Sequence, residues 1–445
     1  MDLKQSISIL NWLFILFPIS FIAGNFIINL HFLIFIFFGC LYLKIKQIKF
    51  QYNYLLIVFL LFCLTLIISS ILNQFNITKS FLYLRYIFFY FICCYLIKEK
   101  KFAINKIFFF YSIFALIISV DVIIQHTLGY NIIGIEIKKF GLSQTPVATS
   151  FFMEEPIAGS FIQMFGFYLA FVVFNKFDKK NILHLTIKIV SLFLISFSIF
   201  VSFQRMPMVL WMFFLTIYGI VFYKSKLLPI ILSFAILALF INNFSSKEIN
   251  ESYKSFFDNI AGVSGSESVI TKTFKNYKII NNKKAYDEIK SDSIKAQQFE
   301  GGSGHGSLYA NAIFIWRDYK IFGIGYKNFY NKCNEKKLTR CSTHPHNYYL
   351  DILVSTGLVG FSIMLIYLTI LCIKIFFSLR KKIENKNSKA IDFLFITVIN
   401  FLIFFFPLKS SGSFFTTANS TYMIITLVIL ISQLENINFK KKYKI

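Results

Sequence analysis

Apolar runs of about 18–22 residues recur along almost the whole chain, and they limit the folds open to it. A run of this length crosses the ~30 Å hydrocarbon core of a bilayer as a helix. The composition agrees, because 56% of the 445 residues are hydrophobic and 59 are phenylalanine. Soluble domains average nearer to about 45–50% apolar residues. We therefore predict an all-α, polytopic membrane protein.

About twelve of these runs are predicted to be transmembrane helices. The first follows a lone Lys4 and lacks a small-x-small cleavage site, so we interpret it as a retained helix rather than a removed signal peptide. The predicted spans are 6–24, 26–43, 53–72, 77–97, 103–127, 156–175, 183–202, 206–223, 227–243, 347–376, 391–407 and 418–434.

Basic residues show a strong bias between the two sets of short connections. One set holds about twenty Lys and Arg and the other about five, so the positive-inside rule places the basic set and both termini in the cytoplasm. The net charge of +25 is therefore largely a topology signal, spread over many loops without a nucleic-acid motif. The basic segments are 44–49, 98–101, 176–180, 224–226, 380–389 and the tail 440–444.

The opposite face carries the longer connections, 129–155 and 244–345, which in a Gram-negative cell lie in the periplasm. The second is too long for a linker and contains a helical pattern at 307–322, so it is predicted to be a small helical domain. The three expected parts are an N-terminal membrane bundle, the periplasmic loop domain and C-terminal membrane helices with the motif described next, at 1–243, 244–345 and 346–445.

A motif opens the C-terminal part. His346 and Asn347 are followed by nine residues, Gly357, two residues and Gly360. In this respect the chain resembles the O-antigen ligase and polymerase superfamily of membrane glycosyltransferases, in which a similar motif follows a large periplasmic loop. The segments 202–210 and 315–329 also resemble family segments, and the resemblance covers most of residues 80–375.

The resemblance implies transfer of an undecaprenyl-diphosphate-linked glycan to an acceptor hydroxyl, without metal or cofactor. The acceptor is a lipid A–core sugar in a ligase and another lipid-linked repeat unit in a polymerase; the motif spacing favours the ligase. A lipid-linked oligosaccharide flippase or other transporter remains the alternative from a different class. The sequence shows no Walker loop, no dinucleotide fingerprint and no metal-spaced Cys/His cluster.

Two arginines occur in or at predicted spans, although only five of the 46 basic residues are arginine. Arg85 lies about eight residues into the fourth span, roughly 12 Å at 1.5 Å per residue. Arg205 begins the eighth span at the same outer face. A planar guanidinium suits phosphate oxygens, so both are predicted to bind the leaving diphosphate. Arg85 could instead pair with Asp121, and Arg205 could be a flank residue.

His346 is the candidate general base, because an imidazole titrates near neutral pH and can take a proton from a sugar hydroxyl. His344 is expected to shape the site, and Asn347 to orient the imidazole or cap the helix. Glu155 and Tyr348 are candidates for binding acceptor sugar, although solvation and an aromatic belt explain them as well.

Two cysteines, Cys333 and Cys341, fall in the large outer loop, shortly before His346. An oxidising periplasm permits a bridge between them, and the sequence leaves open whether it forms. Its use would be to hold the segment that leads to His346. One departure from the family is His305, which stands where relatives often have an arginine, so an arginine role at that point is in doubt. Together these features predict a site at the periplasmic face of the inner membrane.

Overall fold

The structure is a computed structural model of the chain. It describes residues 2–47, 54–140, 145–153, 155–176, 181–221, 227–244, 250–251, 253–254, 269–291, 305–338, 340–384, 388–407, 409 and 412–435.

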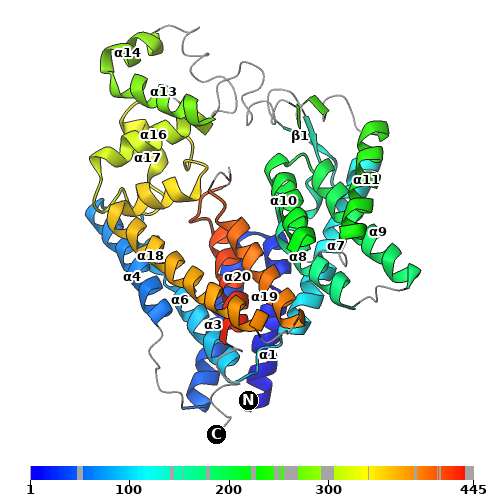
Figure 1. The fold of residues 1–445 in the computed structure, drawn as a ribbon. Helices are drawn as coiled ribbons and strands as arrows, with labels where there is room; N and C mark the ends of the chain where they lie inside the picture. The colour runs from blue at the N-terminus through cyan, green and yellow to red at the C-terminus, as the bar shows by residue number, and fades with distance from the viewer. Residues whose placement is uncertain are drawn as a thin grey trace.

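Helices make up nearly all of the described chain (Figure 1). The membrane helices are α1 (Leu3–Ile15), α2 (Phe17–Ala23), α3 (Asn25–Ile45), α4 (Tyr54–Leu72), α5 (Ile77–Leu82), α6 (Arg85–Lys98), α7 (Ile104–Leu128), α8 (Ala158–Lys176), α9 (Ile182–Val201), α10 (Arg205–Val221), α11 (Leu227–Phe244), α18 (Tyr348–Glu384), α19 (Ser388–Phe404) and α20 (Thr417–Glu435). The others are α13 (Val269–Asn281), α14 (Lys283–Ser291), α16 (His305–Asp318), α17 (Phe329–Glu335), the short η1 (Ser150–Phe152), and the strands β1 (Lys138–Phe140) and β2 (Thr145–Val147).

Each predicted span corresponds to a helix in the part of the chain that is described. Within the described residues, eight helical segments are long and apolar enough to cross a membrane. The pair α1 and α2, bent by 46°, adds a ninth if the two helices form one span. The shorter apolar helices α10, α11 and α19 occupy the three remaining predicted ranges. The prediction of an all-α polytopic membrane protein is confirmed.

The bend between α1 and α2 follows from a proline. Pro18 has no N–H, so the Phe14 carbonyl loses its helical donor. The Tyr111 hydroxyl donates to that carbonyl at 2.9 Å, and His31 Nε2 donates to the neighbouring carbonyl of Leu13 at 2.7 Å. Neighbouring helices thus satisfy the backbone groups that a broken helix exposes at membrane depth.

Helices α13, α14, α16 and α17 lie together beyond one end of the membrane bundle, and α1 begins at the opposite end (Figure 1). They have a hydrophobic cluster of their own, to which α18 contributes Val354. The predicted helix over 307–322 is α16, which starts two residues earlier and ends at Asp318. This helical unit therefore sits directly on the outer end of α18.

Helix α18 is broken at Gly357, whose φ is 65° and ψ −167°. Beyond the break, the N–H groups of Leu358 and Val359 do not donate to carbonyls of α18. They donate to the carbonyls of Lys320 at 2.8 Å and Ile321 at 3.2 Å, in the loop that follows α16.

The carbonyls left free in α18 take donors from the same loop. Ile324 N donates to Val354 O at 2.8 Å, and Gly325 N donates to Ser355 O at 3.0 Å. The Ser69 hydroxyl of α4 also donates to Ser355 O, at 2.8 Å. These hydrogen bonds satisfy the backbone groups that the break leaves without helical partners. They also hold the loop domain against the membrane helix that follows the His-Asn motif.

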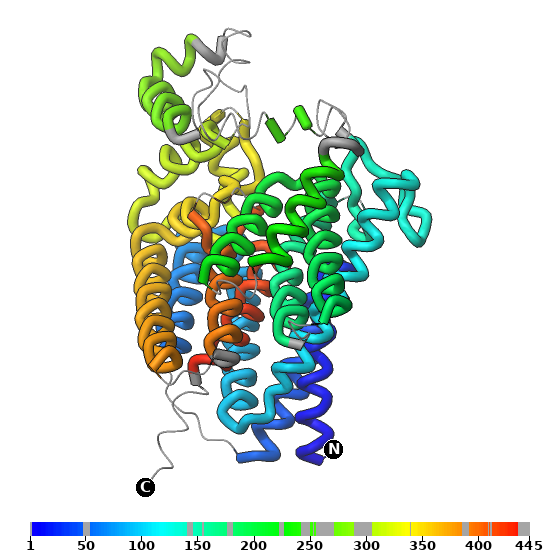
Figure 2. Tube along the Cα trace, turned by 45° about the vertical axis from the view of Figure 1, so that its right-hand side comes forward, coloured from blue at the N-terminus to red at the C-terminus, as the bar shows by residue number. Residues whose placement is uncertain are grey.

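Glycine is required at the two closest points of this exchange. A Cβ on Gly357 would lie 2.2 Å from the Ile321 carbonyl oxygen, and a Cβ on Gly323 would lie 2.5 Å from the Val354 carbonyl oxygen. Gly360 brings α18 close to α4, where its Cβ would meet Thr65 Oγ1 at 2.7 Å. The two helices run side by side in both views (Figure 2).

Candidate active site

The residues His346 and Asn347 of the motif lie directly before the first turn of α18. His346 has φ +57°, the left-handed region, which is uncommon outside glycine. Asn347 then caps the helix, because its Oδ1 accepts from the N–H groups of Tyr349 at 3.0 Å and Leu350 at 3.2 Å. Its Nδ2 donates to Pro407 O at 2.7 Å, which joins α18 to the segment after α19. The capping alternative for Asn347 is thus the one observed.

Three imidazoles meet at this helix start. The ring of His346 lies 4.1 Å from that of His344 and 5.3 Å from that of His305, the first residue of α16. His346 Nε2 is 3.3 Å from the Ser342 hydroxyl, and His344 Nδ1 is 2.8 Å from that of Thr343. The side chain proposed as base therefore lies where the loop domain meets the membrane helix.

Arg205 belongs to the same group. Burial, together with the nearby charges of His346, Arg340 and Arg205, lowers the pKa of His305 to about 4. Three elements that are distant in sequence, the starts of α10, α16 and α18, thus converge on one positively charged site.

The start of α10 is fixed by the residue before it. Gln204 Oε1 accepts from both the backbone N–H and the hydroxyl of Ser160, each at 2.7 Å. A Cβ on the adjacent Gly159 would lie 2.1 Å from Ser202 Oγ, so α8 approaches this turn closely. The position of Arg205 therefore depends on α8 as well as on its own helix.

Part of the chain matches a known protein family. Residues 190–365 match the family model described as O-antigen ligase. Over this segment the chain is similar to O-antigen ligases. The matched segment contains Arg205, His305, His346, Gly357 and Gly360 and leaves Arg85 outside. A search of curated proteins finds no match.

The similarity of residues 190–365 to O-antigen ligases, together with the apolar helices, points to a bacterial membrane protein of the membrane glycosyltransferase type. The matched family implies lipid-linked glycans as substrates. Among the described residues no group of three or more His, Cys, Asp or Glu side chains is arranged to hold a metal ion.

Arg85 lies in a different group from Arg205. Its guanidinium donates to Leu82 O at 3.0 Å and to the Tyr86 hydroxyl at 2.9 Å, and it sits 4.5 Å above the Tyr86 ring. The suggested pair with Asp121 is wrong. Asp121 accepts from the Ser150 hydroxyl at 2.5 Å and from backbone and amide groups at 131–132.

The two candidates for sugar binding have different surroundings. Tyr348 is 3% exposed and packs against Phe404 and Phe414, with ring centroids 5.0 and 5.7 Å apart, which suits a core residue better than a sugar platform. Glu155 is exposed just before α8, and its N–H donates to Phe152 O. Glu155 remains free to meet solvent or an acceptor.

Four polar residues at or near the candidate site have no role assigned from the sequence. Asp351 is buried one turn after the motif and accepts from the Ser413 hydroxyl at 2.6 Å and from Phe414 N at 2.9 Å. Lys409 is buried against Tyr348 and Phe404, and burial lowers its pKa to about 8. The other two are His305 and Arg340. Asp351 and Lys409 are charged residues within apolar sequence, and this pattern is the signal by which they could have been selected.

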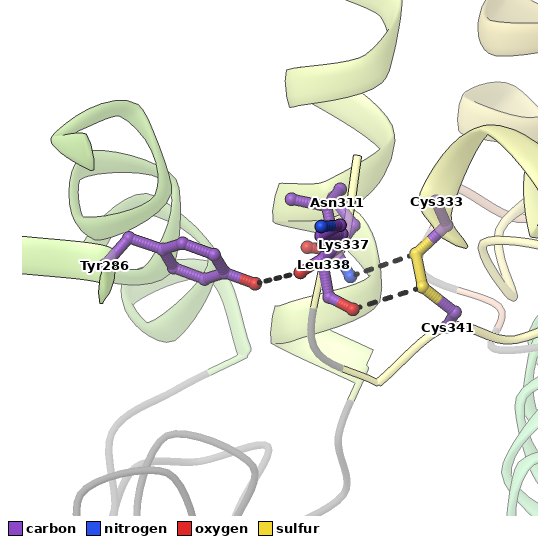
Figure 3. Close-up of a disulfide and its surroundings, with 6 residues drawn as sticks. All are labelled: Tyr286, Asn311, Cys333, Lys337, Leu338 and Cys341. Atoms are coloured by element: carbon purple, nitrogen blue, oxygen red, sulfur yellow. Dashed lines mark hydrogen bonds between the residues drawn. A yellow bond between two sulfur atoms is a disulfide. The ribbon is translucent and has the colours of Figure 1, made fainter. Parts of the chain in front are cut away.

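The cysteine pair is bridged. Cys333 and Cys341 form a disulfide with Cα atoms 5.7 Å apart, and Cys333 Sγ lies 3.9 Å from Asn311 Nδ2 of α16 (Figure 3). The Tyr286 hydroxyl of α14 donates to Lys337 O inside the closed loop, at 3.3 Å. The bridge thus ties the segment before His346 to the loop domain.

Breaking this bridge is expected to weaken the site without unfolding the membrane part. Cys341→Ser should stay inserted, lose up to about tenfold in activity and lower the melting temperature, since a small loop gains at most ~2–3 kcal/mol from its crosslink. A non-reducing digest of the wild type should yield one linked peptide pair. Free thiols at both Cys333 and Cys341 in protein purified without reductant would refute the bridge.

Proposed function

We propose that the chain transfers a glycan from undecaprenyl diphosphate to a hydroxyl of lipid A–core, as an O-antigen ligase at the periplasmic face of the inner membrane. The observation that carries the proposal is the convergence of His346 and Arg205 on His305 at the outer start of α18. The family match and the basic connections at the opposite face support the assignment and the orientation.

In the proposed reaction the neutral imidazole of His346 takes the proton of the acceptor hydroxyl. The hydroxyl oxygen attacks the anomeric carbon, and the bond from that carbon to the diphosphate oxygen breaks. The electron pair of that bond leaves with the diphosphate. The left-handed backbone of His346 and the cap at Asn347 fix the imidazole at the helix start.

Arg205 stabilises the charge that grows on the leaving diphosphate, because a preorganised cation is most effective where charge develops in the transition state. Its guanidinium can give two parallel hydrogen bonds to phosphate oxygens. Since the pKa of His305 is about 4, that imidazole is neutral at pH 7 and can accept a hydrogen bond without adding charge. The sequence-based assignment of Arg85 to the same diphosphate is replaced by a different proposal below.

A strain that lacks the chain separates the ligase from the polymerase. Loss of all long glycan from the lipid A–core, with polyprenyl-linked polymer accumulating, is expected for a ligase. Core that carries a single repeat unit indicates a polymerase instead, which makes the same chemical demands on His346 and Arg205. An unchanged lipopolysaccharide ladder contradicts both.

Replacement of Arg205 by lysine tests the phosphate role. A flank residue needs only a positive charge, whereas a diphosphate ligand needs the planar fork, so Arg205→Lys should lower transfer at least about tenfold, or ~1.4 kcal/mol in the barrier. Arg380→Lys is the matched control, because Arg380 makes an exposed i,i+4 pair with Glu384 that contributes little. Initial rates with purified protein give the comparison. Near-full activity of Arg205→Lys would show that this arginine is only an anchor.

A further inference from the structure

A row of three tyrosines runs between two cations on the outer part of the bundle. The Arg85 guanidinium lies 4.5 Å above the Tyr86 ring, and Tyr86 packs edge-on against Tyr83 with centroids 4.8 Å apart. The ring centroids of Tyr83 and Tyr326 lie 6.1 Å apart, and Lys327 Nζ lies 5.3 Å from the centre of the Tyr326 ring. We call Tyr83, Tyr86 and Tyr326 the tyrosine row.

The row is held rigidly from behind, because each hydroxyl bonds at or near the start of α20. Tyr86 donates to Thr417 O at 3.3 Å, and Tyr326 donates to Phe415 O at 3.1 Å. Tyr83 shares a hydrogen bond of 3.0 Å with the Ser420 hydroxyl. The orientations of the three rings are thus fixed.

The charge at this row is not neutralised within the described part of the chain. None of its ion pairs includes Arg85, Lys327 or Lys79. Arg85 Nε is buried and has no hydrogen-bond partner there. Burial lowers the pKa of Lys327, and the charges of Lys79 and Arg85 lower it further.

Among the described residues, the negative charge that acts on Lys327 is Asp351, which is buried. Its Oδ2 already accepts from the Ser413 hydroxyl and from Phe414 N. The three rings are buried, and the cations beside them therefore give this part of the outer face a net positive charge. Lysine 327 also has φ +54°, a backbone conformation that a lysine seldom adopts without a local reason.

An apolar surface borders these cations. Helix α5 exposes Ile77 by 37%, Phe81 by 49% and Leu82 by 58%, and Arg85 follows directly in the chain. Cations beside exposed apolar side chains at the edge of a membrane fit a lipid whose head is anionic and whose chains remain in the bilayer.

We propose that Arg85, Lys327 and Lys79 bind the phosphate groups of the acceptor lipid, with its acyl chains against α5. This inference rests on the proposed transfer function. It assigns the two arginines to two substrates: Arg205 to the donor diphosphate and Arg85 to the acceptor. Helix α6 packs against α3 and α20, whereas α10 packs against α8, α9 and α19, so the two arginines belong to different parts of the bundle.

The path from the row to His346 is short and continuous. Tyr326 bonds to Phe415 O, the adjacent Phe414 N bonds to Asp351, and Asp351 N bonds to Asn347 O at 2.9 Å in the first turn of α18. These bonds couple the row to the turn that carries His346, and the row is separate from the Arg205 site.

The test uses purified protein, a lipid-linked donor and lipid A–core acceptor with or without its phosphates. Arg85→Gln and Lys327→Gln should each raise KM for the phosphorylated acceptor about tenfold and leave KM for the donor within about threefold. Removing the phosphates should raise the wild-type KM for acceptor to a similar extent and abolish the difference between wild type and variants. Lys320→Gln removes an exposed charge from the same loop and should change neither constant.

A rise in donor KM, or unchanged acceptor KM in both variants, overturns the acceptor site while the transfer function stands. A binding measurement makes the test independent of turnover. Wild-type protein should bind lipid A more tightly with its phosphates than without them, and Arg85→Gln should reduce this preference. Equal binding of both forms by the wild type would also overturn the inference. Failure of the transfer function itself appears separately, as absence of any glycan on acceptor with the wild type.

Discussion

Replacing His346 with asparagine is expected to lower glycan transfer by roughly 10²–10⁴-fold, the usual loss when a general base is removed. Asparagine suits the test because it tolerates the left-handed conformation that His346 adopts, φ +57°, whereas alanine adds backbone strain. His346→Asn should therefore insert and melt like the wild type. His346→Ala should lose the same activity with slightly lower stability.

Two comparisons make this prediction specific. His344→Ala, which removes the ring 4.1 Å away, should cost less than either change at His346. His126→Ala, at the end of α7, should leave the rate unchanged and serves as the background control. Activity of His346→Asn within about threefold of wild type would remove the general-base assignment, and a larger loss for His344→Ala would show that the other imidazole is the base.

Substitution of Gly357 by alanine is expected to have the largest effect on stability. The new Cβ would lie 2.2 Å from the Ile321 carbonyl oxygen, at the point where α18 and the loop exchange backbone bonds. Either the Ile321 carbonyl must move away from the new Cβ, or the four hydrogen bonds between α18 and the loop must lengthen or break. We expect a cost of at least about 3 kcal/mol, from overpacking together with the positive φ.

Gly129→Ala is the matched control for this change. Gly129 also has positive φ, +84°, but a Cβ there would meet nothing within 4 Å. It should cost only about 1 kcal/mol, from backbone strain alone. Melting temperatures and yields in detergent give the comparison, and equal losses for the two variants would mean that the exchange at Gly357 contributes little.

The helices of this fold can be predicted from sequence because each span has its own apolar run. A long apolar run determines a helix without knowledge of its neighbours, so every predicted range is occupied. The breaks were not accessible in the same way. Gly357 was singled out by its place in a motif, but nothing local indicated that residues 320–325 would supply its missing hydrogen bonds.

The candidate site was predictable in part for the same reason. His346 and Arg205 each stand in a local motif, whereas their approach through His305 depends on the packing of three helix starts. Similar depth in the bilayer suggested that Arg85 pairs with Asp121, but depth says nothing about position around the bundle. Asp121 in fact binds the turn at 131–132 and Ser150.

The most direct test of the central claim is a transfer assay with the purified protein in detergent. The donor is an undecaprenyl-diphosphate-linked glycan, the acceptor is lipid A–core, and the product is glycan joined to core. The account predicts transfer by the wild type without a sealed vesicle, release of undecaprenyl diphosphate in equal amount, and loss of both products in His346→Asn. If folded wild-type protein forms no linked product and releases no undecaprenyl diphosphate, or if His346→Asn matches the wild type, the account is contradicted.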